Sequence, residues 1–338
     1  MTHHSKTFHS GDSDSPHAPS LLRPDIKALL DRFEPGFLEK RLTRQIDHIT
    51  RYFGKGVGHF HFENIDWIST ISEFAFKATG LYRLGYKNFQ QIELTENRIE
   101  IPNLPVRFHN FRILHLSDMH LDIDPILPDL IIRRLAGASF DLCVITGDFR
   151  LLTQGKYERS MADIEKIRPH LDCRHGVYAI LGNHDFIEMV PYLEQLDIRM
   201  LLNESARIQR DGSSLGLAGV DDPHFYGLHD LDRAVKAIAH EEVKILLAHS
   251  PELYKSAHRL GFNVYLAGHT HGGQVCLPGR IPIFLNVSCP RRFAARSWRY
   301  ESMYGYTSTG AGSSGVPVRF FCPPEITIHT LLPASTDH

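Results

Sequence analysis

Short apolar runs alternate with helical stretches from about residue 111 to the C-terminus. Six runs are continuous enough to predict buried strands: FRILHLS, DLCVIT, VYAIL, LGLAGV, VKILLAH and FNVYLAG. Apolar positions at helical spacing predict helices near residues 128–136, 158–168, 231–240 and 251–260. A last run, ITIHTLL, predicts one more strand close to the C-terminus. This alternation is typical of an α/β domain with mostly buried sheets.

Two helical segments are predicted before this domain. The first covers about residues 22–52, with a break at Glu34-Pro35-Gly36. The second covers about residues 64–84, where Ile71, Phe74 and other apolar residues would line one face, with Phe76 beside it. That helix has three interpretations: a helix docked on the catalytic domain, an apolar lid, or an amphipathic helix at a membrane surface. Its neighbours are not strongly basic, so the docked helix is our first expectation.

Composition divides the chain into three parts. Residues 1–20 are polar and rich in Ser, His and Pro, which predicts a disordered tail. We expect a helical N-terminal extension over residues 21–105 and the catalytic domain over residues 106–335. No apolar run approaches the ~20 residues of a membrane span, so contact with a membrane would be peripheral.

Charge and cysteine content narrow the classes of function and the cellular setting. The formal net charge is -2, from 37 basic and 39 acidic residues, so no nucleic-acid partner is expected. The five cysteines form no CxxC pair and are odd in number, which indicates neither a disulfide framework nor a thiolate zinc site. A cytoplasmic protein is the simplest interpretation.

Polar residues follow five of the predicted strands directly. Ligands of α/β proteins gather beyond the carboxyl ends of the strands, so these side chains are expected to meet. The five endings are Asp118-Met119-His120, Gly147-Asp148, Gly182-Asn183-His184-Asp185, His249 and Gly268-His269-Thr270-His271. Oxygen and nitrogen donors without sulfur suit Mn²⁺, Fe or Zn²⁺ better than Ca²⁺.

The ordered motifs DxH, GD, GNHD, H and GHxH resemble those of the calcineurin-like metallophosphoesterase superfamily over about residues 112–332. HGGQ at 271–274 and YTSTGAGSS at 306–314 resemble the bacterial phosphodiesterase branch related to UDP-2,3-diacylglucosamine pyrophosphatases. The resemblance implies a four-layer α/β/β/α sandwich of two mixed sheets. It also implies two divalent metal ions, with Mn²⁺ the first expectation and Fe or Zn²⁺ the alternatives.

The resemblance assigns a role to each motif residue. One metal would be held by Asp118, His120 and His271, the other by Asn183, His249 and His269, with Asp148 bridging the two. His184 would act on the substrate as a catalytic acid or hydrogen-bond donor, and Asp185 would orient it through a hydrogen bond. Two such ions acidify a bridging water, and the hydroxide attacks phosphorus.

One position departs from the family pattern, which often has GDxxD. Here Leu151 replaces the second carboxylate, so the residues that support the metal site are expected to differ from the family's, while the bridging Asp148 is retained. Arg150 is interpreted either as a phosphate contact or as a surface residue, and Arg319 first as a surface residue and otherwise as a contact to the anionic substrate. Asp221 and Asp222 are interpreted first as a turn, and otherwise as contacts to the substrate or to the residues that hold the metals. His115 is expected to be a core histidine with hydrogen-bond partners.

The predicted function is hydrolysis of a phosphodiester or pyrophosphate bond, on a nucleotide-linked or lipid-linked substrate. The alternatives are a phosphomonoesterase or protein Ser/Thr phosphatase on the same core, and a non-catalytic scaffold. Scaffold members of the superfamily usually lose ligands, whereas every ligand position is retained here. The substrate, the native metal and the oligomeric state are left open by the sequence.

Overall fold

A computed structural model describes residues 26–50, 66–240 and 242–334. The predicted disordered tail, residues 1–20, lies outside the described residues. The helices within them are α1 (Ile26–Arg32), α2 (Pro35–Thr50), α3 (Asp66–Ala78), α4 (Tyr82–Phe89), α5 (Leu127–Leu135), α6 (Glu158–Ile167), α7 (Val190–Gln195), α8 (Leu231–Val235) and α9 (Tyr254–Arg259). Short 3-10 helices are η1 (Val106–Phe108), η2 (Arg168–Leu171), η3 (Ile187–Met189), η4 (Pro251–Leu253), η5 (His271–Gly273) and η6 (Arg291–Phe293).

The described strands form two six-stranded mixed sheets and one small hairpin. The first sheet has the order β1 (Glu93–Ile101), β14 (Glu325–Pro333), β2 (Phe111–Leu116), β3 (Leu142–Ile145), β4 (Val177–Ala179), β5 (Ile198–Met200). The second has the order β12 (Arg296–Tyr300), β13 (Met303–Thr307), β9 (Val264–Ala267), β8 (Lys244–Leu247), β7 (Ser213–Gly219), β6 (Glu204–Arg210). The hairpin consists of β10 (Cys276–Leu277) and β11 (Ile281–Pro282).

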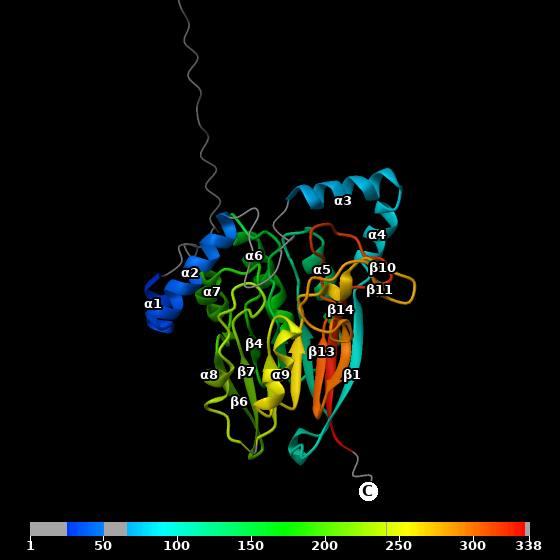
Figure 1. The fold of residues 1–338 in the computed structure, drawn as a ribbon. Helices are drawn as coiled ribbons and strands as arrows, with labels where there is room; N and C mark the ends of the chain where they lie inside the picture. Colours follow the sequence, from blue (N-terminus) through cyan, green and yellow to red (C-terminus); the bar gives the residue numbers. More distant parts are fainter. Residues whose placement is uncertain (1–25, 51–65, 241, 335–338) are drawn as a thin grey trace, which may run out of the picture.

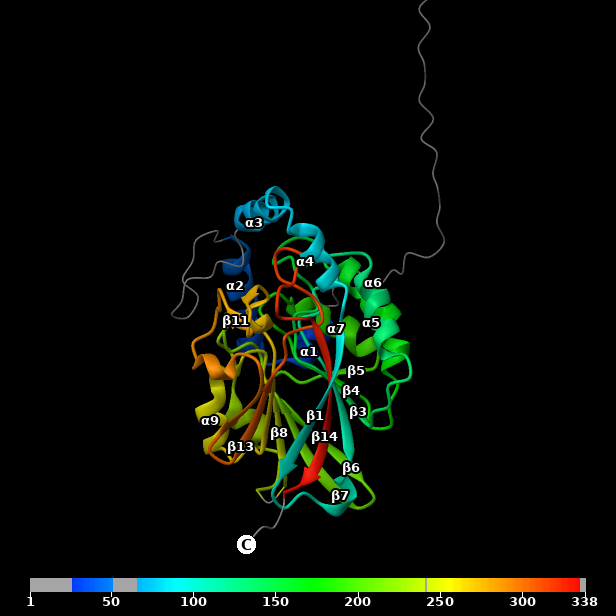
Figure 2. The same ribbon diagram turned by 90° about the vertical axis from the view of Figure 1, so that its right-hand side faces the viewer.

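The two sheets pack face to face, and helices cover both outer faces. Figure 2 shows α5 and α6 on one side of the sandwich and α9 on the other. Strand β2 shows how the layers are built, because Phe111 and Ile113 face the second sheet while Leu114 and Leu116 face the helices. The predicted four-layer α/β/β/α sandwich of mixed sheets is confirmed.

Helix α5 illustrates why the chain forms these outer layers. Pro128 stands in its first turn, where the missing N–H leaves no helical hydrogen bond unmade. Asp129 near the start and the two arginines of the last turn oppose the charges of the helix dipole. Leu127, Leu130 and Ile131 lie on one face and are buried against the first sheet.

The N-terminal extension is only partly helical. We expected helices over about residues 22–52 and 64–84 of this extension and no strand; β1 pairs in parallel with β14 from Glu93↔Glu325 to Ile101↔Pro333 and forms the edge of the first sheet. The sequence ELTENRIEI alternates polar and apolar residues toward its end, as an edge strand with one buried face does. This strand was not predicted from the sequence, and the division into domains stays a prediction.

Helix α3 lies at the end of the molecule opposite the end of β14, with α4 and the β10–β11 hairpin on the same side (Figure 1 and Figure 2). The face that we expected to dock is open, since Ile71 is 55% and Phe74 is 72% exposed. The helix instead contacts the domain through Phe76, whose ring stacks on Phe320 with centroids 5.5 Å apart. A helix packed wholly into the core is therefore excluded.

No helix within the described ranges combines the length and the apolar character needed to cross a membrane.

Candidate metal centre

The predicted ligands converge where the carboxyl ends of both sheets meet. Strands β2, β3 and β4 are neighbours in parallel in the first sheet, and β8 and β9 are parallel neighbours in the second. Each carries its polar residues in the segment that follows it, so two sets of strand ends face each other. All seven predicted ligands are buried: Asp118, His120, Asp148, Asn183, His249, His269 and His271.

One group of donor atoms comes from Asp118, His120 and His271. The two Nε2 atoms of these histidines lie 3.0 Å apart, and Nε2 of His271 lies 3.6 Å from Oδ1 of Asp118. The three side chains place their ligand atoms within 4.8 Å of one another. This is the spacing of donors that share one metal ion.

A second group surrounds Asn183. Its Oδ1 lies 3.0 Å from Nε2 of His249 and 3.0 Å from Nδ1 of His269. Oδ2 of Asp148 lies 3.3 Å from Nε2 of His249 and 3.6 Å from Nε2 of His120. Asp148 therefore stands between the two groups, in the position expected of a bridging carboxylate.

Backbone carbonyls fix which nitrogen of each ring points inward. Nδ1 of His120 donates to the carbonyl of Arg150 at 2.8 Å, and Nδ1 of His249 donates to the carbonyl of Thr146 at 2.7 Å. Nε2 of His269 donates to the carbonyl of Asn286 at 3.0 Å, which leaves Nδ1 facing Asn183. The inward nitrogen of each ring then carries a lone pair, as a metal ligand requires.

The protonation of the cluster also fits a cation. Burial lowers the pKa of His120 to about 4 despite the opposing charge of Asp148, and burial together with His120 and Arg319 holds the pKa of His271 well below its usual value. Both rings are then neutral, the state in which an imidazole binds a metal ion, and Nδ1 of His271 accepts from the Arg319 guanidinium at 3.1 Å. Burial raises the pKa of Asp118 to about 7, and a nearby cation would keep this carboxylate ionised.

Asp148 and His249 shift each other's pKa. Burial alone would raise the pKa of Asp148, but the imidazoles of His249 and His184 hold that pKa well below its usual value. Burial alone would lower the pKa of His249, but Asp148 and Asp118 raise that pKa well above its usual value. The carboxylates thus attract positive charge to the same place where a metal ion would bind.

Five of the seven candidate ligands have left-handed backbone conformations, with φ between 44° and 72°: Asp118, His120, Asp148, His269 and His271. Such conformations are uncommon for residues other than glycine and are concentrated at functional sites. The backbones that carry Asp148 and Asn183 approach each other closely at Gly147 (φ 90°) and Gly182. A Cβ on Gly147 would lie 2.5 Å from the amide nitrogen of Gly182, so glycine is required there.

His184 lies beside the first group, with its ring edge-on to His120 and the ring centroids 5.0 Å apart. We predicted that Asp185 orients this ring, and the structure corrects that. The Asp185 carboxylate accepts the backbone N–H groups of Asp148, Phe149 and Gly182 at 2.8–2.9 Å, while Nδ1 of His184 donates to the carbonyl of Leu151. Asp185 therefore fixes the backbone of the two ligand loops, not the imidazole.

The position of Leu151 is supported by a carboxylate that the sequence analysis missed. Asp122 accepts the N–H groups of Leu151 and Leu152, and so holds the loop whose carbonyl binds His184. The signal was present in the sequence, because Asp122 follows two residues after His120. It compensates for the missing second carboxylate of the family's GDxxD pattern.

Arg150 and Arg319, for which a surface position was one interpretation, are both buried. The Arg150 guanidinium packs 4.2 Å from the Phe186 ring and donates to the carbonyl of Gln154. Arg319 donates to the carbonyls of His271 and Thr309 at 3.1 and 2.8 Å. The surface interpretation of Arg150 and Arg319 was wrong, and Arg319 holds the backbone around a ligand.

The two aspartates after β7 have different roles. The carboxylate of Asp222 accepts the N–H groups of His224 and Tyr226, so it builds the turn that we expected. Asp221 instead forms a buried ion pair with Arg41 of α2, with Nε and Oδ2 3.1 Å apart. No local sequence pattern indicates this pair, because 180 residues separate its members.

A further buried histidine adjoins the second group. The ring of His224 packs on that of His269 with centroids 4.2 Å apart, and its Nδ1 lies 2.9 Å from Oε1 of Glu252. Glu252 also accepts the N–H of Ser288 at 2.7 Å. This dyad restrains the ligand His269, and the sequence analysis did not identify it.

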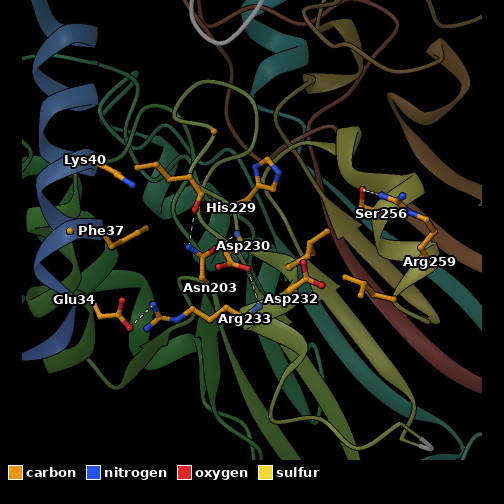
Figure 3. A pocket seen from close by; sticks show the side chains of 15 residues that line it. Glu34, Phe37, Lys40, Asn203, His229, Asp230, Asp232, Arg233, Ser256 and Arg259 are labelled. Atoms are coloured by element: carbon orange, nitrogen blue, oxygen red, sulfur yellow. Dashed lines mark hydrogen bonds and ion pairs between the residues drawn. The ribbon is translucent and has the colours of Figure 1, made fainter.

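A separate cavity of about 840 Å³ lies between α2, α8 and α9 (Figure 3). Its lining is polar and partly paired, for example between Glu34 and Arg233 at 3.1 Å. None of the candidate ligands is among the described residues that line it. The candidate chemistry therefore belongs to the buried cluster at the strand ends.

A family model and protein relatives match this chain. The calcineurin-like phosphoesterase family model matches residues 111–273. The uncharacterized metallophosphoesterase YkuE of Bacillus subtilis is 30% identical over 73% of this chain and 89% of its own length. The transmembrane protein with metallophosphoesterase domain of Bos taurus is 30% identical over 68% of this chain and 55% of its own length. The solved NAD nucleotidase of Haemophilus influenzae is 14% identical, with a TM-score of 0.39 over 60% of this chain and 45% of that one.

The protein is therefore a metal-dependent hydrolase of phosphoric esters. Within that class, the chain belongs to the calcineurin-like phosphoesterase family.

Proposed function

We propose that this phosphoesterase hydrolyses phosphodiester or diphosphate bonds with two divalent ions, Mn²⁺ in the first place. The observation that carries the proposal is the position of Asp148 between two groups of donors. Asp118, His120 and His271 would hold one ion, and Asn183, His249 and His269 would hold the other. When bound, the ions bind phosphate oxygens and lower the pKa of the attacking water.

The side chains around the ions then bind and orient the substrate. With Nδ1 of His184 fixed on the carbonyl of Leu151, Nε2 is directed inward, 3.9 Å from Oδ2 of Asp148. A protonated ring presents Nε2–H to the phosphate or to the leaving oxygen. Asp185 keeps the loops of Asp148 and Asn183 in register through backbone N–H groups.

The charge of the site favours a diester over a monoester. A monoester dianion needs more positive charge than a diester monoanion. Arg150 and Arg319, the arginines that flank the ligand loops, are fully buried. Arg319 directs its donors to backbone carbonyls, to Oγ of Ser313 and to Nδ1 of His271. The HGGQ and YTSTGAGSS motifs support the same choice, through their resemblance to the branch of UDP-2,3-diacylglucosamine pyrophosphatases.

The test compares substrates on one Mn²⁺-loaded preparation. We expect kcat/KM for bis-p-nitrophenyl phosphate to exceed that for p-nitrophenyl phosphate by at least about tenfold, a difference of ~1.4 kcal/mol in transition-state stabilisation. UDP-linked glycolipids test the diphosphate class. A preference for the monoester would contradict the proposal and favour the phosphomonoesterase or protein phosphatase alternative.

A further inference from the structure

A cavity of about 470 Å³ opens directly beside two of the candidate ligands, His269 and His271. Its volume falls within the range of small-molecule binding sites. The remainder of its wall comes from α3, from the segment around the β10–β11 hairpin and from residues 314–318. Its apolar lining residues are Phe76, Val275, Ile283, Phe284, Val316 and Val318.

The lining carries no side chain of Lys, Arg, Asp or Glu among the described residues. Apart from the two histidines, the polar side chains of this wall are neutral, and the described residues offer no charged partner for a second phosphate there. The cavity thus joins a phosphate-binding part, at the two histidines, to an uncharged part that removes apolar groups from water.

The cavity is preformed, because hydrogen bonds within the protein hold its walls together. The side chain of Gln274, from the HGGQ motif, donates to the carbonyls of Ser314 and Val316 at 2.9 and 3.1 Å and accepts the N–H of Ser314 at 2.7 Å. Gln274 therefore ties two walls together. A rigid apolar cavity binds without first ordering its own side chains.

Helix α4 fixes the neighbouring wall. A Cβ on Gly85 would lie 2.6 Å from the Phe320 ring and 2.8 Å from Cβ of Val318, so only glycine permits this packing. The Phe320 ring is in turn stacked on Phe76 of α3. The helices of the N-terminal extension thus position the apolar side of the cavity.

From this geometry we propose that the cavity binds an aliphatic chain of the substrate, so that the substrate is an amphipathic phosphate ester or diphosphate. The aliphatic chain of the substrate contacts Phe76, Val275 and Ile283 while its phosphate lies at the metal centre. This inference rests on the proposed function for the reaction, but its test by binding does not require turnover.

The test measures dissociation constants of ethyl, butyl and octyl phosphate for the Mn²⁺-loaded full chain by titration calorimetry, below the concentration at which octyl phosphate forms micelles. Each fully buried methylene tightens binding by about fourfold, so octyl phosphate, with four more methylenes, is expected to bind roughly 250-fold more tightly than butyl phosphate. Equal affinities for ethyl and octyl phosphate would mean that something else fills the cavity, and would overturn the proposal.

Matched variants separate the cavity from general apolar adsorption. Ile283→Ser, at a lining side chain that is 62% exposed, and Phe76→Ser should each reduce the octyl advantage at least tenfold and leave ethyl phosphate binding unchanged. Phe74→Ser is the control, because Phe74 is on the same helix, 72% exposed and not part of the lining. If Phe74→Ser removes the tighter binding of octyl phosphate, or if the lining variants retain it, the alkyl group binds elsewhere and the proposal is wrong.

The two proposals fail separately in this experiment. If affinity rises with alkyl chain length but no diester or diphosphate is hydrolysed, the result would support the cavity and contradict the proposed reaction. Hydrolysis of bis-p-nitrophenyl phosphate with no dependence of affinity on chain length would support the reaction and overturn the cavity.

Discussion

At the scale of single residues, the site depends on side chains held by backbone groups. Carbonyls of Arg150, Thr146 and Asn286 each bind one nitrogen of a candidate ligand histidine. These contacts fix the tautomer and the direction of the lone pair. They are invisible in the sequence because any residue can supply a carbonyl.

Replacing Asp148 by Asn tests the bridging carboxylate. The amide removes the charge that lies between the two donor groups, so metal content should fall and turnover should drop more than about 100-fold, beyond the range for outer-shell residues. Mass spectrometry of bound metal and steady-state kinetics measure this. Asp172→Asn, at an exposed position, is the control. Full turnover with both metals retained would contradict the role of Asp148.

Replacing His184 by Ala tests the residue that faces the substrate. Turnover should fall roughly 10²–10⁴-fold, the usual contribution of general acid–base catalysis, while metal content stays constant. The exposed His170→Ala provides the matched control. A loss of metal in proportion to activity would make His184 a ligand.

At the scale of elements, α2 connects the N-terminal extension to the ligand loop after β4. The buried guanidinium of Arg41 donates to the carbonyl of Asp185 at 2.9 Å, pairs with Asp221 and lies 3.3 Å from the Tyr226 ring. Gln45, one turn later, accepts the N–H of Ile187 at 3.1 Å. Helix α2 therefore supports the segment that carries Asn183 and His184.

Arg41→Met should destabilise the protein and reduce kcat. It leaves the Asp221 carboxylate buried without its partner, a change that costs about 3–5 kcal/mol. Urea denaturation and kinetics measure the two effects, with the exposed neighbour Lys40→Met as control. The double variant Arg41→Met/Asp221→Asn removes both charges and should recover part of the stability. An unchanged unfolding free energy in Arg41→Met would contradict the role of this pair.

At the scale of the whole molecule, the predicted core histidine His115 is confirmed and has a partner from the far end of the chain. Its Nδ1 lies 3.2 Å from Nε2 of His329, and its Nε2 lies 2.8 Å from Oγ1 of Thr146. Burial lowers the pKa of His115 to about 3, and burial with His115 nearby holds the pKa of His329 well below its usual value.

Stability should therefore fall as the pH falls from about 6.5 toward 3. In that window the unfolded chain binds a proton at His115 that the folded protein does not, so the unfolding free energy decreases by about 2 kcal/mol between pH 7 and pH 5 from this residue alone. Urea denaturation at the two pH values measures it. The His115→Gln variant should lose about 2 kcal/mol less over this range, and an identical pH dependence in both proteins would contradict the assignment.

Much of the fold followed from local patterns. The runs FRILHLS, DLCVIT and VKILLAH became β2, β3 and β8 because a strand buried on both faces must be apolar throughout. The polar residues at their ends marked the site because strand ends are where a buried sheet meets solvent and ligand. Strand β1 escaped prediction, since an edge strand with many charged residues resembles an exposed helix.

The sequence by itself determined the class of fold and the set of candidate ligands. The spacing of apolar residues and the polar residues that follow each strand are local properties of the chain. Only the tertiary structure decided how those ligands are held and what lies beside them. Arg41, Asp122 and Arg319 act on loops that other segments supply, and the apolar cavity joins α3 to residues more than 200 positions later. Contacts between such distant segments depend on how layers pack, and that packing is set by the shape of the whole core.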